Sequence, residues 1–160
     1  MAGKIDARLA ELGITLPEAV APVANYVPYV VVENLIFTAG QITLVGTEVK
    51  YAGIVGTDFS TDEGYQAARL CGLNLLSHAR AACGGDLDRV KRVVKLGGFV
   101  RCPPEFVDQP KVINGASDLM VEVFGDSGLH ARFAVGVTSL PLGAAVEVDA
   151  IFEIARGPGK

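Results

Sequence analysis

The segment 146–154 constrains the fold most, because two kinds of residue alternate along it. Its even-numbered positions are all apolar, whereas acidic residues occupy three of the positions between them, Glu147, Asp149 and Glu153. Successive side chains of a β-strand point to opposite faces of a sheet. The segment therefore predicts a strand with one apolar face toward a core and one mostly acidic face on the other side.

The segment 132–138 repeats this asymmetry. Its large apolar residues fall on one face of the predicted strand, which puts the rest on the opposite face: Arg132, Ala134 and Gly136. The connection 139–144 contains Pro141 and Gly143, two residues that favour turns. We therefore expect these two strands to be antiparallel neighbours.

Helical spacing of apolar residues predicts three helices elsewhere in the chain. A short one covers residues 3–12 and ends at Gly13; a long one runs from Ser60 to Cys83; a third follows Asp108 and ends at Gly125. Residues 29–32 and 35–38 predict a hairpin, 89–100 a strand, and 45–58 a turn with a short strand of undetermined register. This order predicts an α+β fold in one domain over residues 1–160, with both long helices on one sheet face.

The composition indicates what covers the other sheet face. Half of the residues are apolar and 20% are charged, yet every apolar run is interrupted well short of a membrane span. The face away from the helices carries too little charge for water, so we expect a closed oligomer whose sheets pack together. Arg132 and Glu147 would then lie on that face, in crevices between chains. The alternative is an ordinary surface pair worth about 0–1 kcal/mol.

Charge and the rarer side chains exclude several classes of function. A net charge of −4 without a basic run disfavours a nucleic-acid partner. The first thirteen residues lack the apolar core of a secretory signal, which predicts a cytoplasmic protein. Three widely spaced cysteines without a CxxC motif predict buried thiols rather than disulfides or a zinc site. His78 and His130 are interpreted as core or surface histidines, not as metal ligands or catalytic groups.

Three stretches together resemble the Rid family of reactive intermediate (enamine/imine) deaminases, also called YjgF-type or L-PSP-type proteins. The first is ARFAVGV at residues 131–137, followed by Leu140-Pro141 and then VEVDAI at 146–151. Thr38-Ala39-Gly40-Gln41 is similar to the T-S-G-Q strand end of that family, and the third match is the helix 60–83 with the glycine pair after it. The resemblance covers roughly residues 20–155.

This resemblance implies a chorismate-mutase-like fold, a homotrimer with three ligand clefts at its interfaces, and hydrolysis of 2-imino or 2-enamino acids to 2-keto acids and ammonia. Arg132 matches the arginine that binds the substrate carboxylate, and Glu147 matches the acidic residue of the cleft. Among the other substrate-binding positions, Gly40 lies in the matched strand end, Tyr26 falls on the cleft tyrosine, and Asn114 falls near a cleft asparagine once one residue is inserted.

The chemistry suits these residue types. A guanidinium offers parallel N–H donors that match a carboxylate. An imine carbon is already electrophilic, so a positioned water and a proton route suffice, with Glu147 orienting the water or transferring protons. We therefore expect no metal and no organic cofactor.

Departures from the family pattern leave alternatives open. Ala134 replaces a frequent cysteine, Asn25-Tyr26-Val27-Pro28 replaces P-Y-S-Q and makes Tyr29 a competing candidate, and the loop 101–111 differs from the short family loop. One alternative is a trimer that binds 2-keto acids without turnover. Another is a deaminase of a larger enamine such as 2-aminomuconate. Endoribonuclease activity is disfavoured by the acidic charge and the absence of paired histidines.

Overall fold

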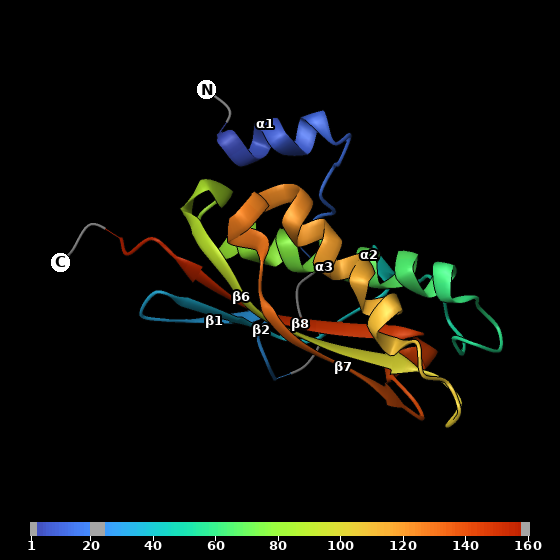
Figure 1. Ribbon diagram of the computed structural model, residues 1–160. Helices are drawn as coiled ribbons and strands as arrows, with labels where there is room; N and C mark the ends of the chain where they lie inside the picture. The colour runs from blue at the N-terminus through green and yellow to red at the C-terminus, as the bar shows by residue number, and fades with distance from the viewer. Residues whose placement is uncertain (1–2, 20–24, 158–160) are drawn as a thin grey trace.

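One mixed β-sheet lies under two long helices, and a third, short helix lies beyond them (Figure 1). The computed structural model describes residues 3–19 and 25–157. Its sheet strands run in the spatial order β1-β2-β8-β6-β7, and β3 also pairs with β8. Their bounds are β1 Tyr29–Val32, β2 Leu35–Thr38, β3 Gln41–Ile42, β6 Val90–Arg101, β7 Ala131–Val137 and β8 Val146–Ile154. A separate hairpin joins β4 (Leu44–Val45) to β5 (Glu48–Val49). The predicted α+β class and the first hairpin are confirmed.

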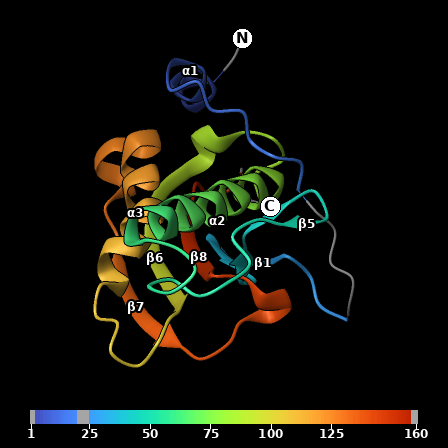
Figure 2. The same ribbon diagram turned by 90° about the vertical axis from the view of Figure 1, so that its right-hand side faces the viewer.

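The two long helices, α2 (Thr61–Ala82) and α3 (Gln109–Phe124), lie side by side on one face of the sheet (Figure 2). The predicted capping box begins α2: Glu63 N donates to Ser60 Oγ at 3.1 Å, and Ser60 N donates to the Glu63 carboxylate at 2.8 Å. Gly115 of α3 lies against the backbone of α2, where a Cβ would collide with the Tyr65 carbonyl oxygen. This glycine lets the two helices approach closely over the sheet.

The predicted pairing of the last two strands is wrong. Strand β7 pairs in parallel with β6, with Arg132 opposite Leu96, whereas β8 pairs antiparallel with the other edge of β6 and with β2. The last two strands do run in opposite directions, but β6 lies between them. The cause is the crossover β6–α3–β7, in which the helix returns the chain to the start of β6 and so makes a parallel pair. The connection 138–145, with the 3₁₀ turn η3 (Pro141–Gly143), then passes around the end of β6.

The hydrophobic core fills the space between the sheet and the two long helices. All five even-numbered residues of β8 are buried, from Val146 to Ile154, which confirms its predicted apolar face. They pack with buried residues of α2, α3 and β6, including Leu75, Ile113 and Leu96. The odd-numbered residues of β8 are half-buried on the other, open face of the sheet.

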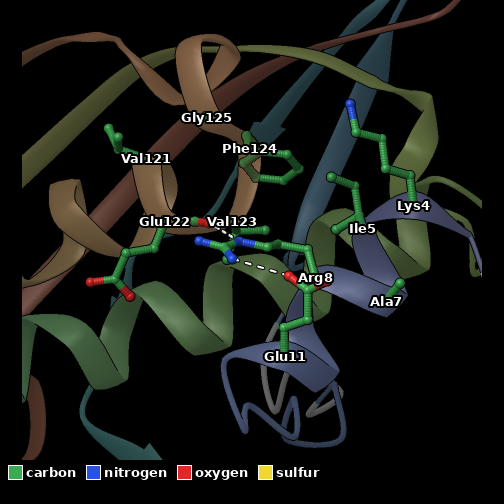
Figure 3. Close-up of a pocket in the computed structure, with 10 residues that line it drawn as sticks. All are labelled: Lys4, Ile5, Ala7, Arg8, Glu11, Val121, Glu122, Val123, Phe124 and Gly125. Carbon is green, nitrogen blue, oxygen red and sulfur yellow. Dashed lines mark hydrogen bonds and ion pairs between the residues drawn. The ribbon is translucent and has the colours of Figure 1, made fainter.

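The N-terminal helix α1 (Lys4–Glu11) confirms the predicted short helix, and distant residues attach it to the domain. The backbone N–H groups of Lys4 and Ile5 both donate to the Asp88 carboxylate at 2.7 Å, and these bonds hold the pKa of Asp88 below its usual range. Arg8 Nε donates to the Glu122 carbonyl of α3 at 2.8 Å, as Figure 3 shows. The hollow drawn there lies where α1 packs against the end of α3, and none of the predicted site residues lines it.

The open face of the sheet exposes apolar side chains in a single chain. Val30 is 48% exposed, and Phe37, its partner on β2, is 37% exposed. The apolar surplus of the composition is therefore partly on the surface, as expected if another subunit covers it. Among the described residues, no helix is long and apolar enough to cross a membrane.

Candidate functional site

Arg132 lies near the start of the edge strand β7 and points toward the helices. Its Nη1 donates to Ser117 Oγ at 3.0 Å, and its Nη2 donates to the Pro110 carbonyl oxygen at 3.0 Å, both on α3. Its cross-strand partner Leu96 is buried under the helices. The prediction that Arg132 lies on the face away from the helices is therefore wrong.

Alternation along a strand shows which residues share a face but not which face the helices cover. Gly98 of β6 decides this, because a Cβ there would lie 2.6 Å from the Ile113 side chain, so α3 sits directly over it. Gly98 is opposite Ala134. The face of Arg132 and Ala134 is therefore the helix side.

Ser117 and His130 extend the contacts of Arg132. Ser117 Oγ lies 2.8 Å from His130 Nε2, and His130 Nδ1 lies 2.6 Å from the Gly128 carbonyl oxygen. Sequence reasoning missed Ser117, since nothing local links it to a strand fifteen positions later. The sequence did contain a signal for His130. It lies two positions before Arg132, and because alternate residues of a strand share a face, it could have been predicted to lie beside Arg132.

Asn114 belongs to the same half of the site. Pro110, Asn114 and Ser117 follow one another at spacings of four and three residues, so they share one face of α3. Arg132 bonds to the first and the last of them. Asn114, whose side chain is exposed, lies between these two residues on that helix face. We call Arg132, Asn114, Ser117 and His130 the arginine half-site.

Glu147 lies on the open face of the sheet, with Gly40 directly beside it. A Cβ at Gly40 would collide with the Glu147 carboxylate, so only glycine leaves this side chain its position. Within the described residues, no donor hydrogen-bonds this carboxylate. Partial burial, with a smaller effect of the neighbouring Asp149 charge, raises the pKa of Glu147. We call Glu147 and Gly40 the glutamate half-site.

The two candidate tyrosines have different surroundings. Tyr26 is 56% exposed in the segment before β1. The Pro28 carbonyl, two residues on, accepts a hydrogen bond from Ala39 N at 2.8 Å, which places this segment alongside Gly40 and the glutamate half-site. The Tyr29 ring instead packs toward α2, with its centroid 6.5 Å from that of His78. Tyr29 is partly buried and packs against the core on the helix side.

His78 and the three cysteines lie outside the two half-sites and are buried or half-buried. His78 is buried, its Nε2 lies 3.2 Å from Gln41 Oε1, and burial lowers the pKa of its imidazole. All three cysteines are free; Cys71 and Cys83 are buried, while Cys102 is half-buried. In the parts of the chain that the structure describes, no cluster of His, Cys, Asp or Glu is arranged to hold a metal ion.

One chain does not bring Arg132 and Glu147 together. Their strands are separated by β6, which corresponds to two strand spacings or about 10 Å, and the side chains leave opposite faces of the sheet. A three- or four-carbon acid cannot touch both within one chain. An ordinary ion pair between them is excluded for the same reason.

Comparison with known proteins identifies the family. Residues 6–154 match the family model described as "YjgF/chorismate_mutase-like, putative endoribonuclease". Protein TCP17 of Trypanosoma cruzi is 50% identical over 153 residues, covering 95% of each chain. The 2-iminobutanoate/2-iminopropanoate deaminase of Dermatophagoides farinae is 32% identical over 141 residues, covering 88% of this chain and 94% of that protein.

A solved structure agrees with this relationship. A protein of unknown function from Agrobacterium tumefaciens superimposes with a TM-score of 0.88 at 48% identity, and the match covers 94% of this chain and 92% of that one. The sheet, the two helices over it and the sequence matches lead to one conclusion. The chain belongs to the YjgF/chorismate mutase-like family.

Proposed function

We propose that this protein hydrolyses small 2-imino or 2-enamino acids to 2-keto acids and ammonia, in clefts shared by two chains. The observation that carries the proposal is the fixed guanidinium of Arg132. Two hydrogen bonds to α3 hold it, yet they use only one donor on each Nη atom and leave the other N–H groups for a ligand. The similarity to a 2-iminobutanoate/2-iminopropanoate deaminase supports this choice of reaction.

In the proposed reaction, Arg132 binds the substrate carboxylate with paired N–H donors. Water then attacks the carbon of the protonated imine while Glu147 accepts one of the water protons, which gives a neutral carbinolamine. Glu147 returns that proton to the nitrogen; the C–N bond then breaks, Glu147 accepts the hydroxyl proton as the C=O bond forms, and ammonia leaves. The raised pKa of Glu147 suits a group that must both accept and return a proton.

The distance between the half-sites leads us to propose that neighbouring chains supply them. The open face carries Glu147 together with exposed apolar side chains such as Val30 and Phe37, and packing these faces around a closed trimer would bury them. The arginine half-site of one copy would then complete the glutamate half-site of the next. In this scheme the partners are two further copies of the chain and a small carboxylate, with no nucleic acid.

A second candidate function is binding of 2-keto acids without turnover. One observation favours it: the arginine half-site is complete within one chain and needs nothing from Glu147 to hold a carboxylate.

The size of the substrate is a separate question. The loop after β6 leads directly to Pro110, so the length of this loop affects how large a substrate fits beside Arg132. Activity measured with a panel of imines that includes a larger enamine such as 2-aminomuconate tests the range of substrate sizes.

Ammonia release from 2-iminopropanoate and 2-iminobutanoate, each generated in situ, tests the proposal. Wild-type protein should accelerate it. Arg132→Ala should reduce the acceleration by about a hundredfold or more, because two charge-assisted hydrogen bonds are lost. Arg156→Ala, at an exposed position far along the chain, is the matched control and should behave like wild type. Full activity of Arg132→Ala would exclude the proposed role, and no turnover by wild type with intact 2-oxobutanoate binding would favour the second candidate.

A further inference from the structure

We propose that Ser117 and His130 are positioning residues that hold the Arg132 guanidinium in the orientation that binds substrate. The inference rests on the proposed role of Arg132 as carboxylate ligand. It assigns a function to a serine–histidine pair that the reaction itself does not use. The pair lies beside the guanidinium, and the contacts run from Arg132 to Ser117, from Ser117 to His130, and from His130 to the Gly128 carbonyl.

The chemistry of the end groups gives each of these bonds one direction when the imidazole is neutral. The Gly128 carbonyl only accepts, so His130 Nδ1 carries the proton that bridges the 2.6 Å between them. In the neutral imidazole Nε2 is then an acceptor, and the Ser117 hydroxyl donates to it over 2.8 Å. The guanidinium only donates, so Ser117 Oγ receives the Arg132 bond on a lone pair. The three bonds are thus mutually consistent and leave the hydroxyl no freedom to rotate.

The chain of bonds ends on rigid backbone. Gly128 is buried in the 3₁₀ turn η2 (Gly125–Gly128), where a Cβ would collide with the Met120 carbonyl oxygen of α3. Only glycine therefore lets this turn pack close enough to α3 for its carbonyl to reach His130. The second anchor of Arg132, the Pro110 carbonyl, also belongs to α3. Both Nη atoms are fixed against the same helix.

The bond from Arg132 argues against Ser117 as a nucleophile. A hydroxyl that donates to a histidine nitrogen is also how a base activates a serine, but here one lone pair of Ser117 Oγ accepts from Arg132, a cation that makes the oxygen a poorer nucleophile. A proton relay through the pair would affect the chemical step, whereas positioning of Arg132 affects how tightly the carboxylate is bound. The two roles therefore predict different changes in kcat and KM.

Binding and turnover of Ser117→Ala, Ser117→Thr and His130→Ala test the inference, with Ser139→Ala at an exposed position as the control. The dissociation constant for 2-oxobutanoate, measured by calorimetry, does not depend on turnover. We expect Ser117→Ala to raise Kd and KM about tenfold, with kcat within about threefold of wild type. Ser117→Thr keeps the hydroxyl and should restore both constants, and His130→Ala should give part of the Ser117→Ala effect.

Two results would overturn the inference: unchanged Kd in both alanine variants, or a fall in kcat with unchanged Kd, which indicates a proton relay. Circular dichroism and thermal melting check that the variants fold. If wild type binds 2-oxobutanoate but hydrolyses no imino acid, the proposed deamination fails while the Kd series still decides the role of Ser117 and His130. If wild type does not bind 2-oxobutanoate, the role of Arg132 and this inference both fail.

Discussion

The two half-sites differ in how far one chain completes them. Arg132 is held at two nitrogen atoms by Ser117 and Pro110 of α3, and His130 supports the first of these contacts through Ser117. Glu147 is half-buried on the bare face of the sheet, and no donor among the described residues satisfies it. The arginine half-site therefore holds its guanidinium in one orientation, as the proposed carboxylate binding requires, whereas the glutamate half-site keeps its own carboxylate in an unfavourable environment.

This difference suits the two proposed roles, carboxylate binding by the arginine half-site and proton transfer by the glutamate half-site. Partial burial without a hydrogen-bond donor disfavours the ionised form of Glu147, and this raises its pKa. A carboxyl group with a raised pKa transfers protons more readily near neutral pH than an ordinary one. The comparison predicts that changes in the glutamate half-site act on kcat and leave the affinity for 2-keto acids intact.

Glu147→Gln should have the largest effect. It removes the group that we propose accepts and returns the proton, so kcat should fall by about a hundredfold to ten-thousandfold. The Kd for 2-oxobutanoate should stay within about threefold of wild type. Glu18→Gln, at an exposed position, is the control. A kcat near wild type would remove Glu147 from the chemistry.

Arg132→Lys is the next largest change. Lysine keeps the positive charge but has only three N–H donors on one nitrogen, so bonds to Ser117 Oγ and the Pro110 carbonyl would leave it no pair of donors for a carboxylate. We expect kcat/KM to fall about a hundredfold, mostly through KM, with a matching rise in the calorimetric Kd. Arg156→Lys is the matched control. Wild-type affinity in Arg132→Lys would mean that charge alone binds the ligand.

Gly40→Ala probes the glutamate half-site without changing its charge. The added Cβ would collide with the Glu147 carboxylate, which is the flexible end of a side chain, so the fold survives and the carboxylate moves. We expect kcat to fall about tenfold, as displacement of a catalytic group by about 1 Å is costly. Gly157→Ala, which meets no neighbouring atom, serves as control. A larger loss of affinity than of kcat would contradict the separation of the half-sites.

Asp149→Asn should have the smallest effect, on the pH profile. The Asp149 charge adds to burial in raising the pKa of Glu147, so its removal lowers that pKa. If Glu147 acts as a base, activity is lost as the pH falls through its pKa. The acid limb of kcat against pH should therefore move to lower pH. A shift to higher pH would contradict the assignment.

The parts that local sequence determines were predicted correctly. The capping box at Ser60 and Glu63 fixes the start of α2, and the alternation in 146–154 fixes the buried face of β8. The predicted neighbour of β7 was β8, but the crossover through α3 pairs β7 with β6 instead. The residues of a strand carry no pattern that shows which strand such a crossover places beside it. The prediction of which sheet face carries Arg132 was also wrong. That face is decided by where α3 packs, and α3 packs over Gly98, which leaves room for the Ile113 side chain.

The arrangement of the candidate site residues differs from the prediction. Glu147 lies beside Gly40, whereas Arg132 leaves the opposite face of the sheet toward α3. Ser117 was not predicted because its contact with β7 depends on how α3 packs against that strand, which the sequence pattern does not show. Its contact with Arg132 links the middle of one element to the start of another.

Complementation between two inactive variants tests most directly whether neighbouring chains share the site. Arg132→Ala and Glu147→Gln would be co-expressed in equal amounts and purified as mixed oligomers. If each cleft takes its arginine from one chain and its glutamate from the next, about a quarter of the clefts in random closed oligomers contain both native residues. The account predicts imine hydrolysis at about that fraction of the wild-type rate. Mixed oligomers as inactive as the separate variants would contradict it.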